Sequence, residues 1–365
     1  EVDDLYELAK YKIEKINPII VGVTGSTGKT SVTAFLTQLL SFKYRVAKGG
    51  LNTKLGLSTE VINNISSDCN VFVAEIGMNG LGQIDKITEM YPPHIAVVTT
   101  VNQTHAEKLG SIENIAKAKS EIINHMNEKD VLIVNKDNEF TQAIGEKFVG
   151  KVIWYGESTI NNCGYNLSGF KPLGLHNRLN MLATIHVAEE IGMSTAEIQE
   201  QIPNIIVPKG RLNLILGISG SKLIDDTYNA SPVSTKYAID TLVKYPSKRR
   251  IAILGDMLEL GTIEIQEHEK IGKYVAENPI DVFIGVGPLM KKAVEIAKKT
   301  DIESYHLENS AKFKQELFLH LDINSGDTIL VKGSQGIRME KITEVLMEEP
   351  EKAPQLLVRQ DIRWK

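Results

Sequence analysis

Gly22-Val23-Thr24-Gly25-Ser26-Thr27-Gly28-Lys29-Thr30 is the stretch that decides the fold. It follows an apolar run, Ile19–Val23, and precedes a helical pattern. In that context backbone N–H groups and the start of a helix can hold phosphate groups. Lys29 is expected to reach the terminal phosphates, and the Thr30 hydroxyl is expected to bind Mg²⁺. We therefore predict a nucleotide site whose loop residues are Thr24, Gly25, Ser26, Thr27, Gly28, Lys29 and Thr30.

The loop departs from the strict phosphate-loop consensus, because Val23 occupies the position of its first glycine.

A second sequence pattern indicates which base the bound nucleotide carries. Guanine-specific proteins carry Asn-Lys-x-Asp after a later strand. This chain has Asn135-Lys136-Asp137-Asn138, with asparagine in the last position. The sequence therefore favours ATP over GTP.

Short β-branched runs alternate with helical patterns along both halves of the chain, which is typical of parallel strands joined by crossover helices. The expected strands are Ile19–Val23, Val71–Ala74, Ile95–Thr99, Val131–Val134, Val152–Tyr155, Leu212–Leu216, Lys222–Ile224, Ile251–Leu254, Val282–Ile284 and Thr328–Val331. The proline-containing stretch 203–208 separates the two series. We predict an α/β protein of two domains. Residues 1–206 form a P-loop ATPase domain with a central, mainly parallel sheet, and residues 207–365 form a smaller Rossmann-like domain.

Composition narrows the class of function. The chain has 365 residues, 42% of them hydrophobic, and a formal net charge of −5 without a basic stripe, so nucleic acid is not an expected partner. No apolar run approaches the ~20 residues that span a bilayer, and no export signal begins the chain. Cys69 and Cys163 have no metal-binding spacing. We expect a cytoplasmic monomer that acts on small molecules and does not bind membranes.

Two further residues follow predicted strands at the edge that carries the phosphate loop. Glu75 ends an apolar strand, so its carboxylate is expected beside the loop, where Mg²⁺ needs a second protein oxygen. His105 follows the strand Ile95–Thr99 and reaches the same edge. A lone loop histidine is more often an ordinary surface residue, and spacing alone leaves that alternative open.

Further motifs, together with the phosphate loop, resemble the Mur ligase family. Those of the family's central ATPase domain are Glu75-Ile76-Gly77, the stretch from His105 to Ser111, Ala116–Ile122, and His176-Asn177-Arg178-Leu179-Asn180. Three motifs resemble the branch that adds D-alanyl-D-alanine to a cell-wall peptide, and these are Ile224–Pro232, Leu254–Gly261 and Val331–Glu340. The resemblance covers almost the whole chain.

The resemblance implies two Mg²⁺ ions. Thr30 and Glu75 match the residues that hold one ion against the phosphates, and His105 matches a residue that helps to hold the second. Lys119 matches a lysine that is carbamylated in the family. Carbamylation would turn a neutral amine into an anionic oxygen ligand, so Lys119 joins the expected metal site. On the residues alone, Lys119 would be an ordinary solvated lysine.

The resemblance also assigns nucleotide contacts. Asn177 and Asn180 are expected against adenine, Arg211 at the γ-phosphate, and Asp226 at the ribose hydroxyls. Helix capping is the alternative for the two asparagines. The expected catalytic residues are Lys29, Lys119, His105 and Arg211. Because Arg211 and Asp226 follow the linker, domain closure near residues 206–210 is expected to complete the site.

The implied reaction is an ATP-dependent carboxylate–amine ligation through an acyl phosphate. It would add D-alanyl-D-alanine to a muramoyl-tripeptide cell-wall precursor and release ADP and phosphate. About twenty residues precede the loop, too few for a domain, so the UDP-binding domain of most Mur ligases is not expected in this chain.

Two alternatives stay open. One is the same chemistry with a different acceptor or amine, of the folylpolyglutamate, cyanophycin or pseudomurein type. The other is a nucleotide-binding regulatory protein that has lost the reaction. Lys332, Ser334 and Arg338 are candidates for selecting the dipeptide, with a solvated loop as the equal alternative.

Overall fold

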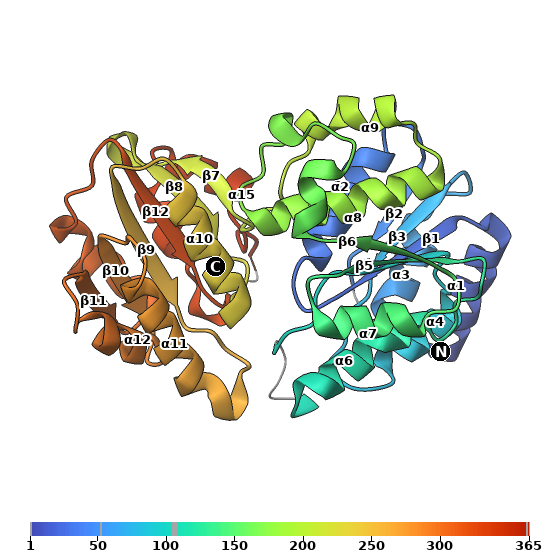
Figure 1. Cartoon of the computed structure of the whole chain (residues 1–365), viewed down its shortest axis with the longest axis horizontal. Coiled ribbons are helices and arrows are strands. Elements are labelled where there is room, and N and C mark those ends of the chain that lie inside the picture. Colours follow the sequence, from blue (N-terminus) through green and yellow to red (C-terminus); the bar gives the residue numbers. More distant parts are fainter. Residues whose placement is uncertain (1, 52, 104–108, 363, 365) are drawn as a thin grey trace. The chain divides into compact units, whose positions relative to one another are not determined.

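The structure is a computed structural model that describes residues 2–51, 53–103, 109–362 and 364. The chain forms two compact units (Figure 1). Unit 1 comprises residues 1–171 and 176–206, and unit 2 comprises residues 172–175 and 207–365. The chain enters unit 2 briefly at residues 172–175 and finally at Val207, which lies inside the proline-containing stretch expected to be a linker.

A six-stranded parallel sheet in the order β2-β3-β1-β4-β5-β6 forms the centre of unit 1. The strands are β1 Ile19–Thr24, β2 Val46–Gly49, β3 Val71–Glu75, β4 Ile95–Val98, β5 Val131–Asn135 and β6 Lys151–Tyr155. β1, β3, β4 and β5 are almost fully buried, as expected for strands covered on both faces. The sheet therefore presents the carboxyl ends of its central strands at one edge.

Helices cover both faces of that sheet (Figure 1). They are α1 Val2–Ile16, α2 Lys29–Leu40, α3 Lys54–Asn64, α4 Gln83–Met90, α6 Ile112–Ser120, α7 Glu139–Lys147, α8 Leu175–Ile191 and α9 Thr195–Gln201. α1, α3, α4, α6 and α7 share one buried apolar cluster with Phe72, Ala96 and Leu132 of the sheet. α2 and α8 lie against the opposite face.

Unit 2 also contains a six-stranded sheet, in the order β11-β10-β9-β12-β8-β7. Its strands are β7 Asn213–Leu216, β8 Lys222–Asp226, β9 Arg249–Gly255, β10 Val282–Val286, β11 Glu303–Leu307 and β12 Asp327–Lys332. Five strands are parallel, and β7 pairs antiparallel with β8. The short η5 turn, Ile218–Gly220, joins β7 to β8, which is too short for a parallel crossover.

Two helical layers enclose the second sheet. α10 Pro232–Lys244, α11 Glu264–Ala276 and α12 Met290–Ala297 pack on one face. α13 Phe313–Glu316, α14 Glu340–Leu346 and α15 Ala353–Leu356 pack on the other. The predicted fold class, a mainly parallel α/β unit followed by a second α/β unit of Rossmann type, is confirmed.

Two strands were not predicted from the sequence. β2 and β11 are edge strands, only partly buried, and carry Lys48 and His306 within them. Neither shows the continuous apolar run that marked the central strands. Leu212, predicted to begin β7, has φ of 56° and lies outside the strand, because a left-handed backbone cannot continue a β ladder.

Candidate active site

The phosphate loop joins β1 to α2 at the carboxyl edge of the first sheet. Residues 25–28 connect Thr24, the last residue of β1, to Lys29, the first of α2. Hydrogen bonds hold the loop to the segment after β4: Ser26 N donates to Thr100 O over 2.7 Å, and Asn102 N donates to Ser26 Oγ over 2.9 Å. These bonds fix the loop against the segment after β4, and the first N–H groups of a helix such as α2 are suited to binding phosphate.

Glycine is required at two loop positions. Gly25 has φ of 147°, and a Cβ there would overlap the Thr99 hydroxyl and lie 3.1 Å from Thr100 N. Gly28 caps α2 in the left-handed region with φ of 90°, and a Cβ there would lie 2.7 Å from Asn180 Oδ1. These glycines let the backbone approach its neighbours closely, as the predicted role demands.

Lys29 folds across the loop. Its Nζ donates a hydrogen bond to Gly25 O over 2.8 Å, so the ammonium lies at the mouth of the loop. Thr24 Oγ1 is buried and has no hydrogen-bond partner among the described residues. An unsatisfied buried hydroxyl next to a glycine loop fits a polar ligand there, because leaving it unpaired costs free energy.

Thr30 and Glu75 meet beside the loop. Glu75 is the last residue of β3 and pairs in register with Val23 of β1. The Thr30 hydroxyl donates to Glu75 Oε1 over 3.2 Å, and Glu75 is 8% exposed. The two oxygens fit a Mg²⁺ ion that takes its other ligands from phosphate and water. No group of three or more His, Cys, Asp or Glu side chains within the described ranges could hold a metal ion by itself.

Lys119 is not a solvated lysine. It lies near the end of α6 and is 2% exposed. Burial, and secondarily the positive charge of Lys29, hold the pKa of Lys119 well below its usual value. The lowered pKa favours the neutral form of this amine. His105, the expected ligand of a second Mg²⁺, lies outside the described residues.

Asn177 and Asn180 lie inside α8 rather than at its cap, so the capping alternative is wrong. Both side chains are buried, and Asn180 Nδ2 donates to Asn177 Oδ1 over 3.4 Å. Asn180 also adjoins Gly28, as the blocked Cβ position there shows. The pair is thus placed at the phosphate loop, on the face covered by α8.

The near-match to a guanine motif has a structural role. Asn135 Oδ1 accepts a hydrogen bond from Asp137 N over 2.9 Å. Asn138 accepts from Thr141 N at the start of α7 and donates to Val101 O over 2.9 Å. These asparagines therefore cap a turn and a helix.

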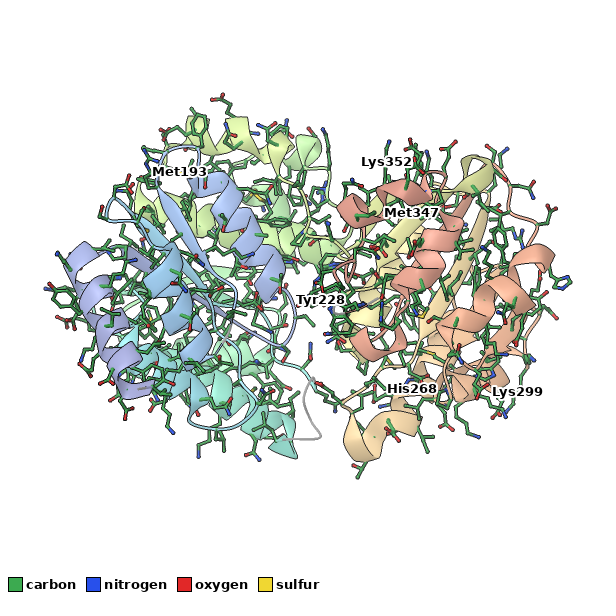
Figure 2. The ribbon with its side chains drawn as sticks, turned by 180° about the vertical axis from the view of Figure 1, so that it is seen from behind. Met193, Tyr228, His268, Lys299, Met347 and Lys352 are labelled. Atoms are coloured by element: carbon green, nitrogen blue, oxygen red, sulfur yellow. The ribbon has the colours of Figure 1, made fainter. Side chains whose placement is uncertain are left out.

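In unit 2 the predicted nucleotide residues are Asp226, at the end of β8, and Arg211, which contacts Tyr228 just after that strand. Asp226 ends β8 and forms a 2.6 Å ion pair with Lys332 Nζ, at the end of the neighbouring strand β12. Burial lowers the pKa of Lys332, and the Asp226 carboxylate opposes that shift. Tyr228 is labelled in Figure 2. The Arg211 guanidinium lies 4.0 Å from the centre of the Tyr228 ring. Arg211 Nε is buried without a hydrogen-bond partner in the described part of the chain.

The three candidates for dipeptide selection form contacts that stabilise the loops of unit 2. Lys332 and Ser334 are 2% exposed, so a solvated loop is wrong for both. Ser334 Oγ accepts from Leu258 N over 2.8 Å and thereby ties two of the family-like motifs together. Arg338 pairs with Glu340 and faces Trp364. These contacts hold the loops at the carboxyl edge of the second sheet.

Sequence reasoning missed the residues that support the loop. Thr99 Oγ1 donates to Thr27 O over 2.5 Å, and the Thr27 and Thr100 hydroxyls lie 2.9 Å apart. The signal was present as three polar residues, with Thr99 ending a predicted strand at the same edge and Thr100 and Asn102 following it.

Comparison with known proteins identifies the protein family to which this site belongs. A family model described as the Mur ligase middle domain matches residues 23–188, and one described as the Mur ligase, glutamate ligase domain matches residues 210–335. A UDP-N-acetylmuramoyl-tripeptide–D-alanyl-D-alanine ligase of Bacillus subtilis (strain 168) is 33% identical over 381 residues, covering 96% of this chain and 81% of that protein. The chain belongs to the Mur ligase family. The predicted family and enzyme class, an ATP-dependent ligase, are confirmed.

Solved structures of Mur ligases agree with this fold. The MurF ligase from Thermotoga maritima in complex with ADP has a TM-score of 0.81 at 26% identity, covering 96% of this chain and 84% of that one. A MurF crystal structure from Acinetobacter baumannii also has a TM-score of 0.81 at 26% identity, covering 94% and 80%. The ADP complex supports ATP binding by the family member described here.

Proposed function

We propose that this Mur ligase joins D-alanyl-D-alanine to a muramoyl-tripeptide cell-wall precursor and converts ATP to ADP and phosphate. The observation that carries the proposal is the pairing of Thr30 with Glu75 beside the phosphate loop, on a chain 33% identical across 96% of its length to a relative named for that reaction. In this proposal residues 1–206 are the ATPase domain and residues 207–365 are the C-terminal domain, and these correspond to units 1 and 2 except for residues 172–175.

In this proposal the phosphate loop and Lys29 bind the phosphates of ATP. The N–H groups at the start of α2 hold the phosphates, and the Lys29 ammonium offsets charge on the γ-phosphate. Thr30 and Glu75 would hold Mg²⁺, which supplies further positive charge against the phosphate oxygens. Arg211 provides a guanidinium suited to phosphate, and Asp226 an acceptor for ribose hydroxyls.

The proposed chemistry has two steps. The carboxylate of the tripeptide attacks the γ-phosphorus, an acyl phosphate forms and ADP leaves. The deprotonated amine of D-alanyl-D-alanine then attacks the acyl carbon, an amide forms and phosphate leaves. Both steps need water to be excluded, because water would hydrolyse the acyl phosphate.

Lys119 is proposed to carry a carbamate. Its neutral amine would attack CO₂ and lose one proton, which places an anionic oxygen pair on a side chain that is itself buried. The lowered pKa of Lys119 and the adjacent positive charge of Lys29 support this. The anionic group would stabilise cations at the γ-phosphate and, with His105, a second Mg²⁺ ion.

A cytoplasmic location is also proposed. Cys69 and Cys163 are both free thiols, which suits a reducing compartment. Among the described residues, no helix has the length and apolar character needed to cross a bilayer.

One assay tests the reaction. The chain is incubated with ATP, Mg²⁺, bicarbonate and D-alanyl-D-alanine, with and without UDP-linked muramoyl tripeptide, and phosphate release and product mass are followed. The expected result is phosphate and pentapeptide product only with both substrates. Turnover with another amine or acceptor instead would move the assignment to a ligase of the folylpolyglutamate, cyanophycin or pseudomurein type.

A pair of lysine variants controls that assay. Lys29→Met removes the ammonium from the loop, where it bonds a glycine carbonyl. Lys43→Met removes an ammonium that likewise bonds a glycine carbonyl, Gly192 O over 3.0 Å, on an exposed face. Activity is expected to disappear in the first variant and persist in the second. Equal loss in both would indicate a folding defect.

A further inference from the structure

The C-terminal tail, residues 357–360, is the feature that the proposed reaction leaves unused. It follows α15 and lies beyond residues 210–335, which match the glutamate ligase domain model. Leu357 is 1% exposed and belongs to the apolar cluster under α13, α14 and α15. The tail is thus part of the packed unit.

Arg359 turns from this tail toward the loop after β8. Its guanidinium donates to Tyr228 O over 3.1 Å and also to Thr227 O. Its Nε donates to Glu340 Oε2 over 3.2 Å, and its side chain is 6% exposed. The backbone adopts φ of 55° at Arg359, a strained value for a residue with a side chain.

Lys332 also holds the same loop. That ammonium bonds Asp226 Oδ2 over 2.6 Å and Asn229 O over 2.9 Å. Two buried cations therefore divide the three consecutive carbonyls of residues 227–229 between them. Such a loop has little freedom to shift relative to Asp226.

The loop in turn fixes the segment that carries Arg211. Tyr228 N donates to Gly210 O over 3.1 Å. Gly210 has φ of 67°, and a Cβ there would lie 2.9 Å from Tyr228 N and 3.0 Å from Val358 Cγ1. Arg211 stacks on the Tyr228 ring at 4.0 Å. The tail, the loop and Arg211 are therefore one contiguous set of contacts within unit 2.

We propose that Arg359 is a positioning residue for ATP: it holds the Thr227–Tyr228 backbone so that the Tyr228 ring presents Arg211 to the terminal phosphates. The proposal rests on the proposed function, in which Arg211 contacts the γ-phosphate. A tail that only stabilises the fold is the competing explanation.

Glu340 makes the proposal testable in a folded protein. This carboxylate is 1% exposed and pairs with both Arg338 and Arg359. Removing Arg359 still leaves Glu340 with a cationic partner, so the variant does not bury an unpaired charge. Arg359→Lys keeps the charge but lacks the planar fork that reaches two carbonyls at once.

The experiment is a double-mutant cycle on ligase kinetics. Arg359→Met is expected to lower kcat/KM for ATP by about tenfold to a hundredfold, with KM for D-alanyl-D-alanine unchanged within about twofold. Arg359→Lys is expected to fall between this variant and the natural chain. In an Arg211→Met background, Arg359→Met is expected to cost no more than about twofold further, because its effect acts through Arg211.

Arg249→Met is the matched control. Arg249 also bonds a backbone carbonyl, Asp322 O over 2.8 Å, and a carboxylate, Asp327, but it begins β9 at the opposite end of the strands. Its activity should stay within about twofold of the natural chain. The inference is overturned if the Arg359 and Arg211 effects multiply, or if Arg249→Met lowers kcat/KM for ATP equally.

Failure of the proposed function is separable from failure of the inference. If the natural chain makes no pentapeptide, the reaction assigned to it is wrong. If the natural chain is active but Arg211→Met is as active, the role of Arg211, and with it the positioning role of Arg359, is refuted while the ligase assignment survives.

Discussion

Replacing Gly25 by alanine is the sharpest perturbation of the phosphate loop. The residue has φ of 147°, and an added Cβ would overlap the Thr99 hydroxyl. That hydroxyl donates to Thr27 O over 2.5 Å and also lies 3.3 Å from Thr24 O. The new methyl therefore cannot be accommodated unless the loop moves away from β4 or Thr99 gives up its contacts.

The magnitude follows from two contributions. Holding a residue with a side chain at such a φ costs about 1–3 kcal/mol. Losing the buried Thr99 hydrogen bond costs about 0.5–1.5 kcal/mol more. The sum is about 1.5–4.5 kcal/mol. If the loop relieves this strain by shifting, nucleotide binding bears the cost, and even about 1.4 kcal/mol weakens affinity tenfold.

Calorimetric titration with a non-hydrolysable ATP analogue and Mg²⁺ measures the effect, and thermal unfolding of the free chain measures stability. Gly82→Ala is the control, since Gly82 has φ of 77° with nothing within 4 Å of an added Cβ. It carries backbone strain of about 1–2 kcal/mol without a clash. We expect the Kd for ATP to rise at least about tenfold in Gly25→Ala and to stay unchanged in Gly82→Ala. A Gly25→Ala chain that binds the analogue like the natural protein would refute the reasoning.

Three other variants test the remaining site. Isotope-labelled bicarbonate should produce a carbamate signal in NMR spectra of the natural chain, and Lys119→Met should abolish it. In the natural chain that signal should weaken as pH falls, because protons compete with CO₂ for the amine. A Lys119→Met spectrum identical to that of the natural chain would exclude carbamylation of Lys119. Thr30→Val removes the hydroxyl beside Glu75, so the Mg²⁺ concentration for half-maximal phosphate release should rise about tenfold; an unchanged Mg²⁺ titration would place the metal elsewhere. Burial raises the pKa of Asp225 from 3.8 to about 7, so its contribution to stability is present below pH 4 and is lost as pH rises toward 7. The Tm of Asp225→Asn minus that of the natural chain should therefore grow across this range and then level off, whereas a constant difference would show that Asp225 does not titrate there.

The local sequence pattern was sufficient to predict the central strands. Runs such as Val71–Glu75 and Val131–Asn135 are buried along their whole length, so their apolar character is continuous and readable. Edge strands gain their hydrogen bonds from one neighbour and expose one flank, so β2 and β11 needed no such run. Their existence depends on the partner strand, which no local window contains.

The sequence by itself determined the phosphate loop, the strand-end position of Glu75 and the family. Each was read from short motifs of neighbouring residues, where glycine conformation and strand–helix order are local properties. Only the tertiary structure decided the burial that lowers the pKa of Lys119, and the pairing of Lys332 with Asp226. It alone brought Arg359 to the loop after β8. Burial and ion pairing join residues a hundred or so positions apart, and they arise only when the strands and the tail pack into one unit.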